Sequence, residues 1–407
     1  MFTPLLVPLI DLHCMNVPLD AVTTPERTYV FFNTGFGSDR HTDLVLAHGE
    51  GSSLGAFVLD ALIPSKKFLN VSTVQEGGFV YLFGSGVYRQ SSVYLARVPL
   101  AEITNVSAYR YYSGMDDGVA VYGASEEVAL PIITSQCVGE LSVRRESASG
   151  ALFMTYNCGD PRGIQLHTAF QPQGPWSAPL TIFDPFADEG YGHFMHIGWS
   201  GEDDGISEDG RFADSGGEYG PYLVPQWFHE DAPGVHDLTY VLSSWNPYTV
   251  HLMHTVVVEP GASAAPAPVL DAGLPTPVLH GLSDSAQWQA NGDGFGFFTT
   301  ADGALMVSTY GAKGDATTGT LSQTFTLDDQ ARELTFWISG GDAHVLLWDG
   351  DDVVRSSTGH RTNDVETLVR WRLKNLRGKT LRLEVSDDLT TPWGFVAARD
   401  FALSAKP

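Results

Sequence analysis

A unit of three β-like segments recurs four times within the first 258 residues, and this repeat constrains the fold more than any other feature of the chain. The third segment of each copy aligns without gaps in the stretches TDLVLAH, SVYLARV, GIQLHTAF and TVHLMHT. Two apolar columns lie two positions apart, on one face of a period-two strand. These columns contain Leu44, Val93, Ile164 and Val250, and then Leu46, Leu95, Leu166 and Leu252.

Two further segments precede the aligned one in every copy. The nearer is an apolar strand, seen as TYVFFNT, FVYLFGS, ALFMTYN and TYVLSSW, and the earlier one is of mixed character, seen as NVPLDAV, FLNVSTVQ, VGELSVRR and YGPYLVPQWF. A fourth, outer strand is expected in AFVLDAL, SAYRYYS and SAPLTIF. Strands in a fixed order at irregular spacing are typical of propeller blades. We therefore predict an all-β chain with a β-propeller of about four blades, and a Greek-key sandwich or barrel is the alternative.

The propeller interpretation assigns a place to the polar residues of the first segments. The first strand of each blade lines the central channel, so its polar side chains share one cavity. The residues expected there are Asp20, Asn70, Ser72, Glu140, Ser142, Tyr219 and Tyr222.

A second domain is expected after the repeat. We place the propeller in residues 1–258, an Ala/Pro-rich linker in 259–277, and a β-sandwich of jelly-roll type in 278–407. Alternating segments such as ELTFWISGG and KTLRLEVSDD, with turn dipeptides such as Asp349-Gly350, favour antiparallel strands there. The tryptophans of this domain are expected mostly in the sandwich core, with one or two exposed for stacking on a sugar: Trp337, Trp348, Trp371 and Trp393.

Composition limits the classes of partner. The formal net charge of −25 repels phosphate backbones and anionic lipid, so nucleic acid and membranes are not expected as partners. No apolar run approaches the ~20 residues that span a bilayer, and we do not expect LLVPLI near the start to be a signal peptide. The three cysteines, Cys14, Cys137 and Cys158, fit no disulfide framework and no metal spacing, so we expect buried or incidental thiols.

Glu140 and Asp20 are the candidate catalytic residues. Glu140 follows a glycine among apolar neighbours on a channel strand, where burial would raise its pKa as a general acid needs. The alternative is a structural carboxylate bonded to the backbone or to Arg144. Asp20 occupies the matching strand of the first copy, and a solvated turn residue is its alternative. Arg89 lies in a glycine-containing hairpin turn, where we expect either a substrate clamp or a surface arginine.

Two histidine-containing segments are candidates for metal sites. The acidic stretch from Asp184 to Tyr222 contains His193 and His196; we expect a flexible rim leading into the channel, with a structural calcium ion as the alternative and zinc disfavoured. No cofactor is expected otherwise. The stretch SSWNPYTVHLMHT places His251 and His254 on a blade's packing strand, and its Trp245 in a turn as a stacking platform for a sugar.

Several of these stretches together resemble a known family. FGSGVYRQSSVYLARVPL, CVGELSVRRES, GPWSAPL, GGEYGPYLVP and SSWNPYTVHLMHT are similar to a bacterial and phage family filed as a domain of unknown function. Its members are expected to be five-bladed propellers, and some are endo-D-arabinofuranases that cut the arabinan of mycobacterial cell walls. The C-terminal part resembles the galactose-binding-like sandwich often appended to glycoside hydrolases. The family's first blade, with a Gly-Asp-Thr-like strand, has no counterpart here, so an incomplete or inactive chain is expected.

The resemblance implies a glycoside hydrolase acting within a furanose polysaccharide such as D-arabinan. Such enzymes use two carboxylates, for which Glu140 and, as a weaker candidate, Asp20 are available, with Arg89, Tyr219, Tyr222 and Trp245 as substrate-binding residues. It also implies an extracellular or cell-surface monomer whose partner is the polysaccharide. The alternative from another class is a non-catalytic carbohydrate-binding or adhesion protein.

Overall fold

The computed structural model describes residues 17–33, 43–50, 57–198, 202–206, 214–259, 262, 279–310, 314–362 and 365–404. Contacts within the chain divide it into two compact units, and each is described by itself. The first unit comprises Met1–Asp184, Glu218–Ser243 and Val250–Pro266. The second comprises Pro185–Gly217, Ser244–Thr249 and Ala267–Pro407. Apart from residues 259 and 262, the expected linker 259–277 lies outside the described residues.

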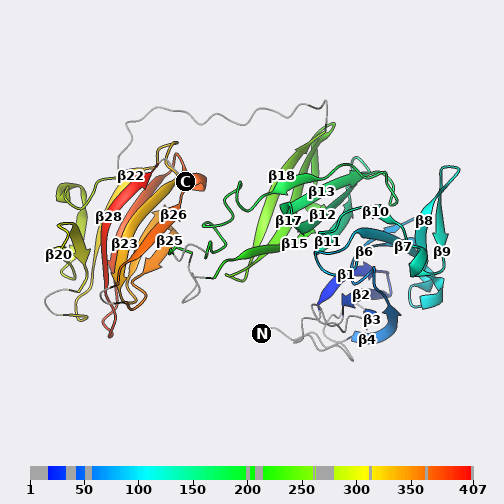
Figure 1. Ribbon diagram of the computed structural model, residues 1–407, viewed down its shortest axis with the longest axis horizontal. Coiled ribbons are helices and arrows are strands. Elements are labelled where there is room, and N and C mark those ends of the chain that lie inside the picture. Colours follow the sequence, from blue (N-terminus) through cyan, green and yellow to red (C-terminus); the bar gives the residue numbers. More distant parts are fainter. Residues whose placement is uncertain are drawn as a thin grey trace. The chain divides into compact units, whose positions relative to one another are not determined.

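Four sheets follow one another along the chain in the first unit (Figure 1). The first contains β1 (Pro18–Thr23), β2 (Arg27–Asn33), β3 (Asp43–Glu50) and β4 (Phe57–Pro64). The second contains β5 (Asn70–Glu76), β6 (Phe79–Ser85), β7 (Val93–Pro99), β8 (Arg110–Asp116) and β9 (Val119–Gly123), with β10 (Pro131–Ile133) also paired to β7. The third contains β11 (Leu141–Arg145), β12 (Leu152–Gly159), β13 (Arg162–Ala169) and β14 (Leu180–Phe183). In the fourth, β17 (Val235–Trp245) pairs with β15 (Gly217–Leu223), β16 (His229–Ala232) and β18 (Thr249–Val258).

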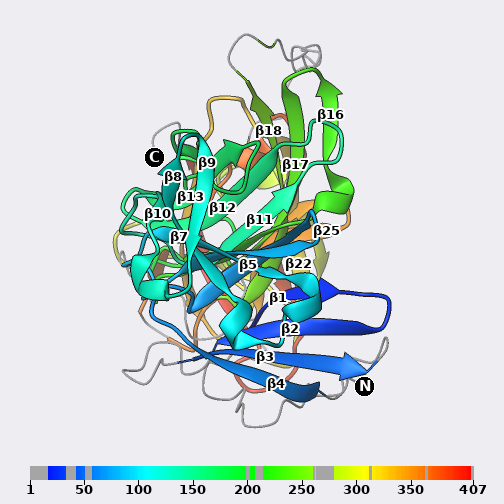
Figure 2. The same cartoon turned by 90° about the vertical axis from the view of Figure 1, so that its right-hand side faces the viewer.

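These sheets are the blades of a propeller, as predicted. In the first and third sheets, strands adjacent in sequence are neighbours in the sheet, and β5 to β9 follow the same order in the second sheet, where β10 also returns to pair with β7. This up-and-down order is typical of propeller blades. The first strands lie side by side, with β5 between β1 and β11 (Figure 2). Ser142 of β11 then accepts a hydrogen bond of 3.1 Å from the backbone of Leu223 in β15. The four first strands are therefore the inner strands.

Apolar faces of neighbouring blades form the core of this unit. One cluster joins the first two blades and includes Val22, Phe31 and Leu82; another joins the second and third and includes Phe83 and Val143. Short 3-10 helices occur in connections: η2 (Leu100–Glu102), η3 (Val106–Ala108), η4 (Glu126–Val128) and η5 (Pro225–Trp227). Among the residues described in either unit, no helix has the length and apolarity that crossing a bilayer requires.

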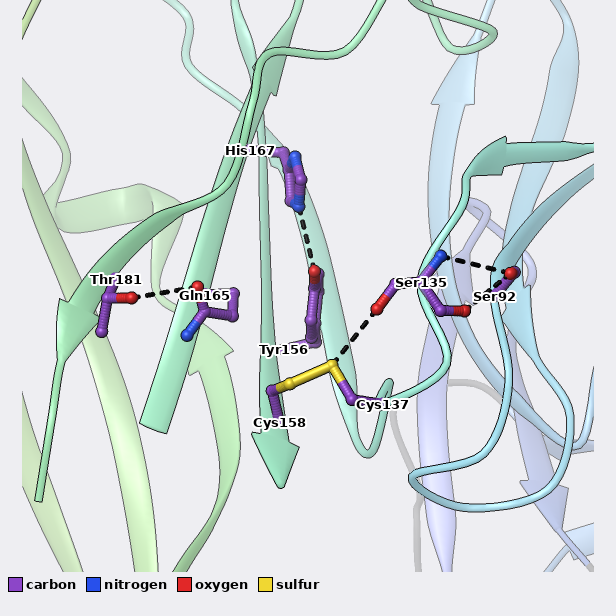
Figure 3. The surroundings of a disulfide bond; sticks show 8 residues. All are labelled: Ser92, Ser135, Cys137, Tyr156, Cys158, Gln165, His167 and Thr181. Carbon is purple, nitrogen blue, oxygen red and sulfur yellow. Dashed lines mark hydrogen bonds between the residues drawn. A yellow bond between two sulfur atoms is a disulfide. The ribbon is translucent and has the colours of Figure 1, made fainter. Parts of the chain in front are cut away.

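The expectation of free thiols is wrong for two of the three cysteines. Cys137 and Cys158 form a disulfide, with their Cα atoms 4.9 Å apart (Figure 3). The segment before β11 runs back along β12 and brings the two sulfurs together, a proximity that a separation of 21 residues does not reveal. Disulfides persist in oxidising compartments. Cys14 lies outside the described residues.

The second unit is a sandwich of two five-stranded sheets. One has the order β19 (Gln289–Gly292), β22 (Gly319–Thr326), β27 (Thr380–Asp387), β24 (His344–Asp349) and β25 (Asp352–Thr358). The other has the order β20 (Gly296–Thr299), β21 (Leu305–Ser308), β28 (Val396–Ser404), β23 (Glu333–Gly340) and β26 (Thr367–Arg372). Two 3-10 helices, η6 (Ser285–Gln287) and η7 (Lys374–Leu376), complete its regular elements among the described residues.

The tryptophans of the sandwich are less buried than expected. Of the four named from the sequence, only Trp371 is fully buried in the core. Trp337, Trp348 and Trp393 are half-buried. The guanidinium of Arg382 lies 4.7 Å from the ring centroid of Trp348 and makes a cation–π contact with it.

The acidic stretch belongs largely to the second unit. Asp203 pairs with Val369 of β26 through a parallel bridge, and its carboxylate lies 2.8 Å from Nε2 of His360. Asp203 and Asp204 are both buried, so the expectation of a flexible rim is wrong for residues 202–206; residues 199–201 and 207–213 lie outside the described residues. Nδ1 of His196 is 2.9 Å from Asp204, whereas Nδ1 of His193 is 3.3 Å from Arg355. The two histidines therefore have different partners.

Candidate active site on the inner strands

Glu140 directly precedes β11, and groups from other segments of the chain surround its carboxyl group. Tyr88 comes from the turn between β6 and β7, and its hydroxyl donates a 3.0 Å hydrogen bond to Oε2 of Glu140. Asn157, at the end of β12, donates a 2.8 Å hydrogen bond to the same hydroxyl. The phenol is thereby oriented, and one oxygen of the carboxyl group has a fixed position.

Burial raises the pKa of Glu140 above its ordinary value. Hydrogen bonds from Tyr88 and from the backbone of Gly220, together with the positive charge of Arg89, act in the opposite direction but are outweighed. Burial also raises the pKa of Tyr88, so this phenol keeps its proton and remains a donor. The arrangement favours a protonated carboxyl group at a higher pH than a free glutamate allows, as a general acid requires.

Gly139 makes room for this arrangement. A Cβ at this position would lie 1.8 Å from Oδ1 of Asn157 and 2.9 Å from Cε2 of Tyr88. Real carbon–oxygen contacts are never so short, and Asn157 is fully buried in a closely packed interior, so a side chain at position 139 would force its neighbours to shift. The glycine noticed before Glu140 in the sequence is therefore needed for the packing of the residues that orient the carboxyl group.

Arg89 lies beside Glu140 and links it to the fourth blade. Its backbone has φ of 53°, in the left-handed region that non-glycine residues rarely adopt and that often marks functional sites. Its Nη2 donates a 3.1 Å hydrogen bond to the backbone carbonyl of Glu218. The carboxylate of Glu218 is itself buried and accepts from Nε and Nη2 of Arg162, with 3.0 Å between Nη2 and Oε2.

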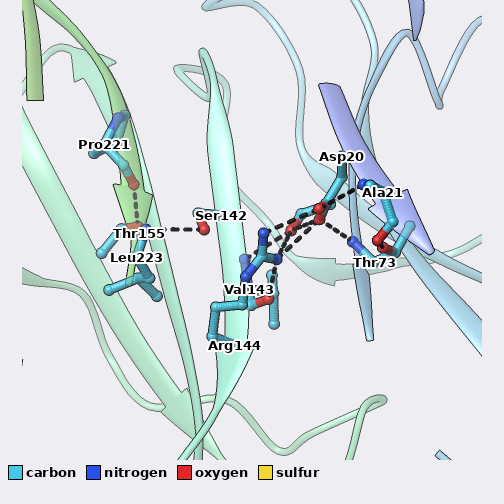
Figure 4. A network of polar contacts seen from close by, with 10 residues as sticks. Asp20, Ala21, Thr73, Ser142, Val143, Arg144, Thr155, Pro221 and Leu223 are labelled. Carbon is cyan, nitrogen blue, oxygen red and sulfur yellow. Dashed lines mark hydrogen bonds and ion pairs between the residues drawn. The ribbon is translucent and has the colours of Figure 1, made fainter. Parts of the chain in front are cut away.

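Asp20 ties three inner strands together (Figure 4). Its Oδ2 lies 2.8 Å from Nη1 of Arg144, and its Oδ1 lies 3.0 Å from Nη2. It also accepts from the hydroxyl of Ser72 at 2.8 Å and from the backbone amides of Thr73 and Ala21. Since β1, β5 and β11 each contribute, this carboxylate holds three blades in register. Its lone pairs are already occupied, which suits a positioning residue more than a base.

Tyr222 connects the two carboxylates electrostatically. Burial is the largest cause that raises the pKa of its phenol, and the negative charges of Glu140 and Asp20 raise this pKa further. The phenol therefore lies within the electrostatic field of both carboxylates. Tyr219 on the same strand β15 is half-buried. The structure thus brings together five of the residues expected from the sequence: Asp20, Arg89, Glu140, Tyr219 and Tyr222. Trp245 belongs to the second unit and is 37% exposed, so its role as a sugar platform remains a prediction.

The sequence reasoning did not select Tyr88, Asn157 or Glu218. A signal for Asn157 was present, because the second segment of each of the first three copies has a polar residue at or near its end: Asn33, Ser85 and Asn157. Tyr88 precedes Arg89 directly, but nothing in the hairpin turn distinguishes it from a surface tyrosine. Glu218 directly precedes the segment YGPYLVPQWF that the repeat identifies, although β15 begins at Gly217 and includes it.

The model of the family described as Domain of unknown function (DUF4185) matches residues 50–254, about half of the chain. No curated protein matches the sequence. The matched region includes Tyr88, Arg89, Glu140 and Glu218, whereas Asp20 precedes it.

Several solved structures resemble the chain. An exo-beta-1,3-galactanase of Phanerochaete chrysosporium with beta-1,3-galactotriose is 11% identical, with a TM-score of 0.39, over 95% of this chain and 81% of that one. An endo-arabinase of Bacteroides thetaiotaomicron is 9% identical, with a TM-score of 0.33, over 72% of this chain and 87% of that one. TmCBM61 with beta-1,4-galactotriose is 18% identical, with a TM-score of 0.22, over 31% of this chain and 94% of that one. At these identities and TM-scores, none of them indicates which residues of this chain act.

Proposed function

Since this chain belongs to the family described as Domain of unknown function (DUF4185), we propose that it is a glycoside hydrolase in which Glu140 is the proton donor. The observation that carries the proposal is the desolvated carboxyl group of Glu140, held by Tyr88 beside the cation Arg89 on the inner strands. Protonation of the leaving oxygen by such a carboxyl group is the acid step of glycoside hydrolysis.

The other residues of the cluster have distinct roles in the proposal. Tyr88 and Asn157 orient the carboxyl group, and Arg89 and Tyr222 bind the substrate beside it. Asp20 acts as a positioning residue, because its hydrogen bonds to Arg144 and Thr73 hold β1 and β5 against β11. Because the acid must be protonated, turnover falls as the pH rises through the raised pKa of Glu140.

The proposed substrate is a furanose polysaccharide, D-arabinan of mycobacterial cell walls, cut within the chain. Support comes from the stretches FGSGVYRQSSVYLARVPL and CVGELSVRRES, which resemble a family that includes some endo-D-arabinofuranases, and which contain Arg89 and Glu140 themselves. The disulfide Cys137–Cys158 supports an extracellular or cell-surface location, where such a polymer is found.

The experiment is incubation of the full chain with mycobacterial arabinogalactan and analysis of the released oligosaccharides. Glu140→Gln is expected to lower turnover by about 10²–10⁴-fold, the usual contribution of a general acid. Glu76→Gln is the matched control, because Glu76 is a glutamate on the inner strand β5 that pairs with Arg145 and takes no part in the cluster. Equal turnover in the wild type and Glu140→Gln would remove Glu140 from the mechanism.

A second candidate function is carbohydrate binding without catalysis. The second unit favours it through an aromatic group in which Tyr310, 50% exposed, lies 5.0 Å from the ring of Phe395. The ring of Trp393 is nearly parallel to that of Phe395, at 13°. The exposed ring of Tyr310 offers an apolar body with a polar tip, against which a sugar ring can pack. Retention of the polymer by the full chain, without release of oligosaccharides, would support binding over hydrolysis.

A further inference from the structure

A cavity of about 480 Å³ lies in the first unit beside the disulfide, apart from the carboxyl group of Glu140. Its residues come from β12 and β13 and from the segment between β10 and β11, and they include Tyr156, Cys158, Gln165 and His167. Arg89 also lines it. Its volume is in the range of small-molecule sites in proteins.

A fixed hydrogen-bond chain forms one side of the cavity (Figure 3). Nδ1 of His167 lies 2.7 Å from the backbone carbonyl of Ser177, which can only accept, so this nitrogen carries the proton. Nε2 therefore accepts, and the hydroxyl of Tyr156, at 3.0 Å, donates to it. Burial lowers the pKa of His167, which agrees with a neutral ring. The side of the cavity formed by these two rings is thus rigid and uncharged.

Two buried donors of the cavity have no partner among the described residues. Gln165 is only 2% exposed; its Oε1 accepts from the hydroxyl of Thr181 at 3.1 Å, which leaves Nε2 unpaired. Nε of Arg89 is unpaired as well, although Nη2 of the same side chain is satisfied. Leaving a buried N–H without an acceptor is costly, so a ligand that supplies oxygen acceptors would gain at both positions.

The charges around the cavity select against ions. Arg89 disfavours a cation, and Asp160 also lines the cavity. Asp160 and the net charge of −25 of the chain as a whole both disfavour an anion. A neutral ligand rich in oxygen acceptors, with apolar faces that can lie against Tyr156, the disulfide and Pro179, fits these conditions. A sugar ring has these properties.

We propose that this cavity binds a neutral sugar unit, and that Gln165 and Arg89 donate hydrogen bonds to its oxygens. Arg89 contacts both this cavity and the Glu140 cluster, so a sugar held here would belong to the same polymer that the cluster acts on. Only this last connection rests on the proposed function; binding of a sugar in the cavity does not.

The test measures binding of methyl α-D-arabinofuranoside and of D-galactose to the full chain by calorimetry and by ligand-observed NMR. Gln165→Leu keeps the shape and removes the donor, and is expected to weaken binding by about three- to tenfold, as for one lost hydrogen bond. Gln171→Leu is the matched control, because Gln171 is an exposed glutamine on the loop after β13. This variant is expected to bind both sugars as the wild type does.

A second variant keeps the test valid if Gln165→Leu folds poorly. Pro179→Trp changes an exposed residue lining the cavity and is expected to block entry, so that binding is lost while the unfolding temperature is unchanged. Glu140→Gln is expected to retain sugar binding. Binding that is unaffected by both cavity variants, or no binding in the wild type, would overturn the proposal.

The outcomes separate this proposal from the proposed function. Gln165-dependent binding without release of oligosaccharides from arabinogalactan supports the cavity and contradicts hydrolysis. Release of oligosaccharides by the wild type, with the same KM in Gln165→Leu and no binding of either sugar, contradicts the cavity and leaves hydrolysis supported.

Discussion

The third and fourth blades carry the same sequence pattern but bury it differently. Leu166 in β13 and Leu252 in β18 occupy one column of the repeat, yet Leu166 is 1% exposed and Leu252 is 63% exposed. Ile164 and Val250, two positions earlier, differ in the same way. β13 lies between β12 and β14, whereas β18 pairs only with β17 among the described strands. A strand's alternation is thus a local property, but its burial depends on a neighbour supplied by the rest of the fold.

The same contrast exists between carboxylates at the inner strands. Glu140, before β11, is surrounded by the uncharged donors Tyr88 and Gly220 with Arg89 nearby, and its pKa is raised by burial. Glu218, on β15, faces Arg162 through both of its oxygens. One site keeps a carboxyl group that is costly to ionise, and the other neutralises its charge with an ion pair. Functional acids are expected in the first kind of environment.

The largest effect on the free energy of unfolding is expected at Leu166, for which the aligned Leu252 is the control. Leu166→Ala is expected to lower the free energy of unfolding by about 2–5 kcal/mol, because it leaves a cavity in a packed interior. Leu252→Ala should change it by no more than about 0.5 kcal/mol, as for a surface residue. Calorimetric unfolding of both variants of the full chain measures the difference. An equal loss in both would mean that the exposed face of β18 is covered in solution.

Removal of the disulfide of the third blade should have the next largest effect. The double variant Cys137→Ser and Cys158→Ser is expected to lose about 3 kcal/mol, the loop-closure contribution for a separation of 21 residues. Chemical denaturation with and without a reductant provides the measurement, and Cys14→Ser serves as the control for loss of a thiol. A wild type that is insensitive to reductant would contradict the pairing.

Gly139 tests how tightly the Glu140 site is packed. Gly139→Ala is expected to destabilise the chain by about 1–3 kcal/mol, since the added methyl group overlaps Asn157 and Tyr88. Gly281→Ala is the matched control, because its added methyl group would meet only the hydroxyl of Ser283, at 4.0 Å. The two unfolding temperatures should separate the variants. Equal temperatures would show that Asn157 can move aside.

The smallest effect on stability depends on pH, and it has opposite signs for the replacement of Glu140 and of Glu218 by glutamine. Since burial raises the pKa of Glu140 in the folded chain, its contribution to stability is present below the unfolded pKa and is lost as the pH rises through the folded one. Glu140→Gln should therefore match the wild type in acid and exceed it by about 1 kcal/mol at higher pH. Glu218→Gln should be less stable at neutral pH, because Arg162 loses this ion-pair partner.

Unfolding temperatures recorded across the pH range would check this prediction. A Glu140→Gln variant that becomes less stable than the wild type as the pH rises would contradict the interpretation of Glu140 as a desolvated acid. Stability of Glu218→Gln equal to that of the wild type at neutral pH would show that the pair with Arg162 contributes nothing.

Part of the candidate site was predictable from the sequence. Glu140, Asp20 and Tyr222 were placed on inner strands because the repeat identifies the first strand of each blade. Their roles were not predictable, because they depend on partners from other blades. Asp20 is engaged by Arg144 from 124 positions later in the chain, and Arg89 by a carbonyl 129 positions away. No pattern within one strand contains that information.

The sequence by itself determined the repeated strands of the blades and the change to a second β-domain, since each depends on alternation and turn residues that act over a few positions. Only the tertiary structure decided which cysteines pair, that the buried Asp203 packs on β26, and that Leu252 is exposed where Leu166 is not. These outcomes depend on which surfaces meet. Burial, desolvation and pairing of charges are properties of two segments in contact and not of either segment alone.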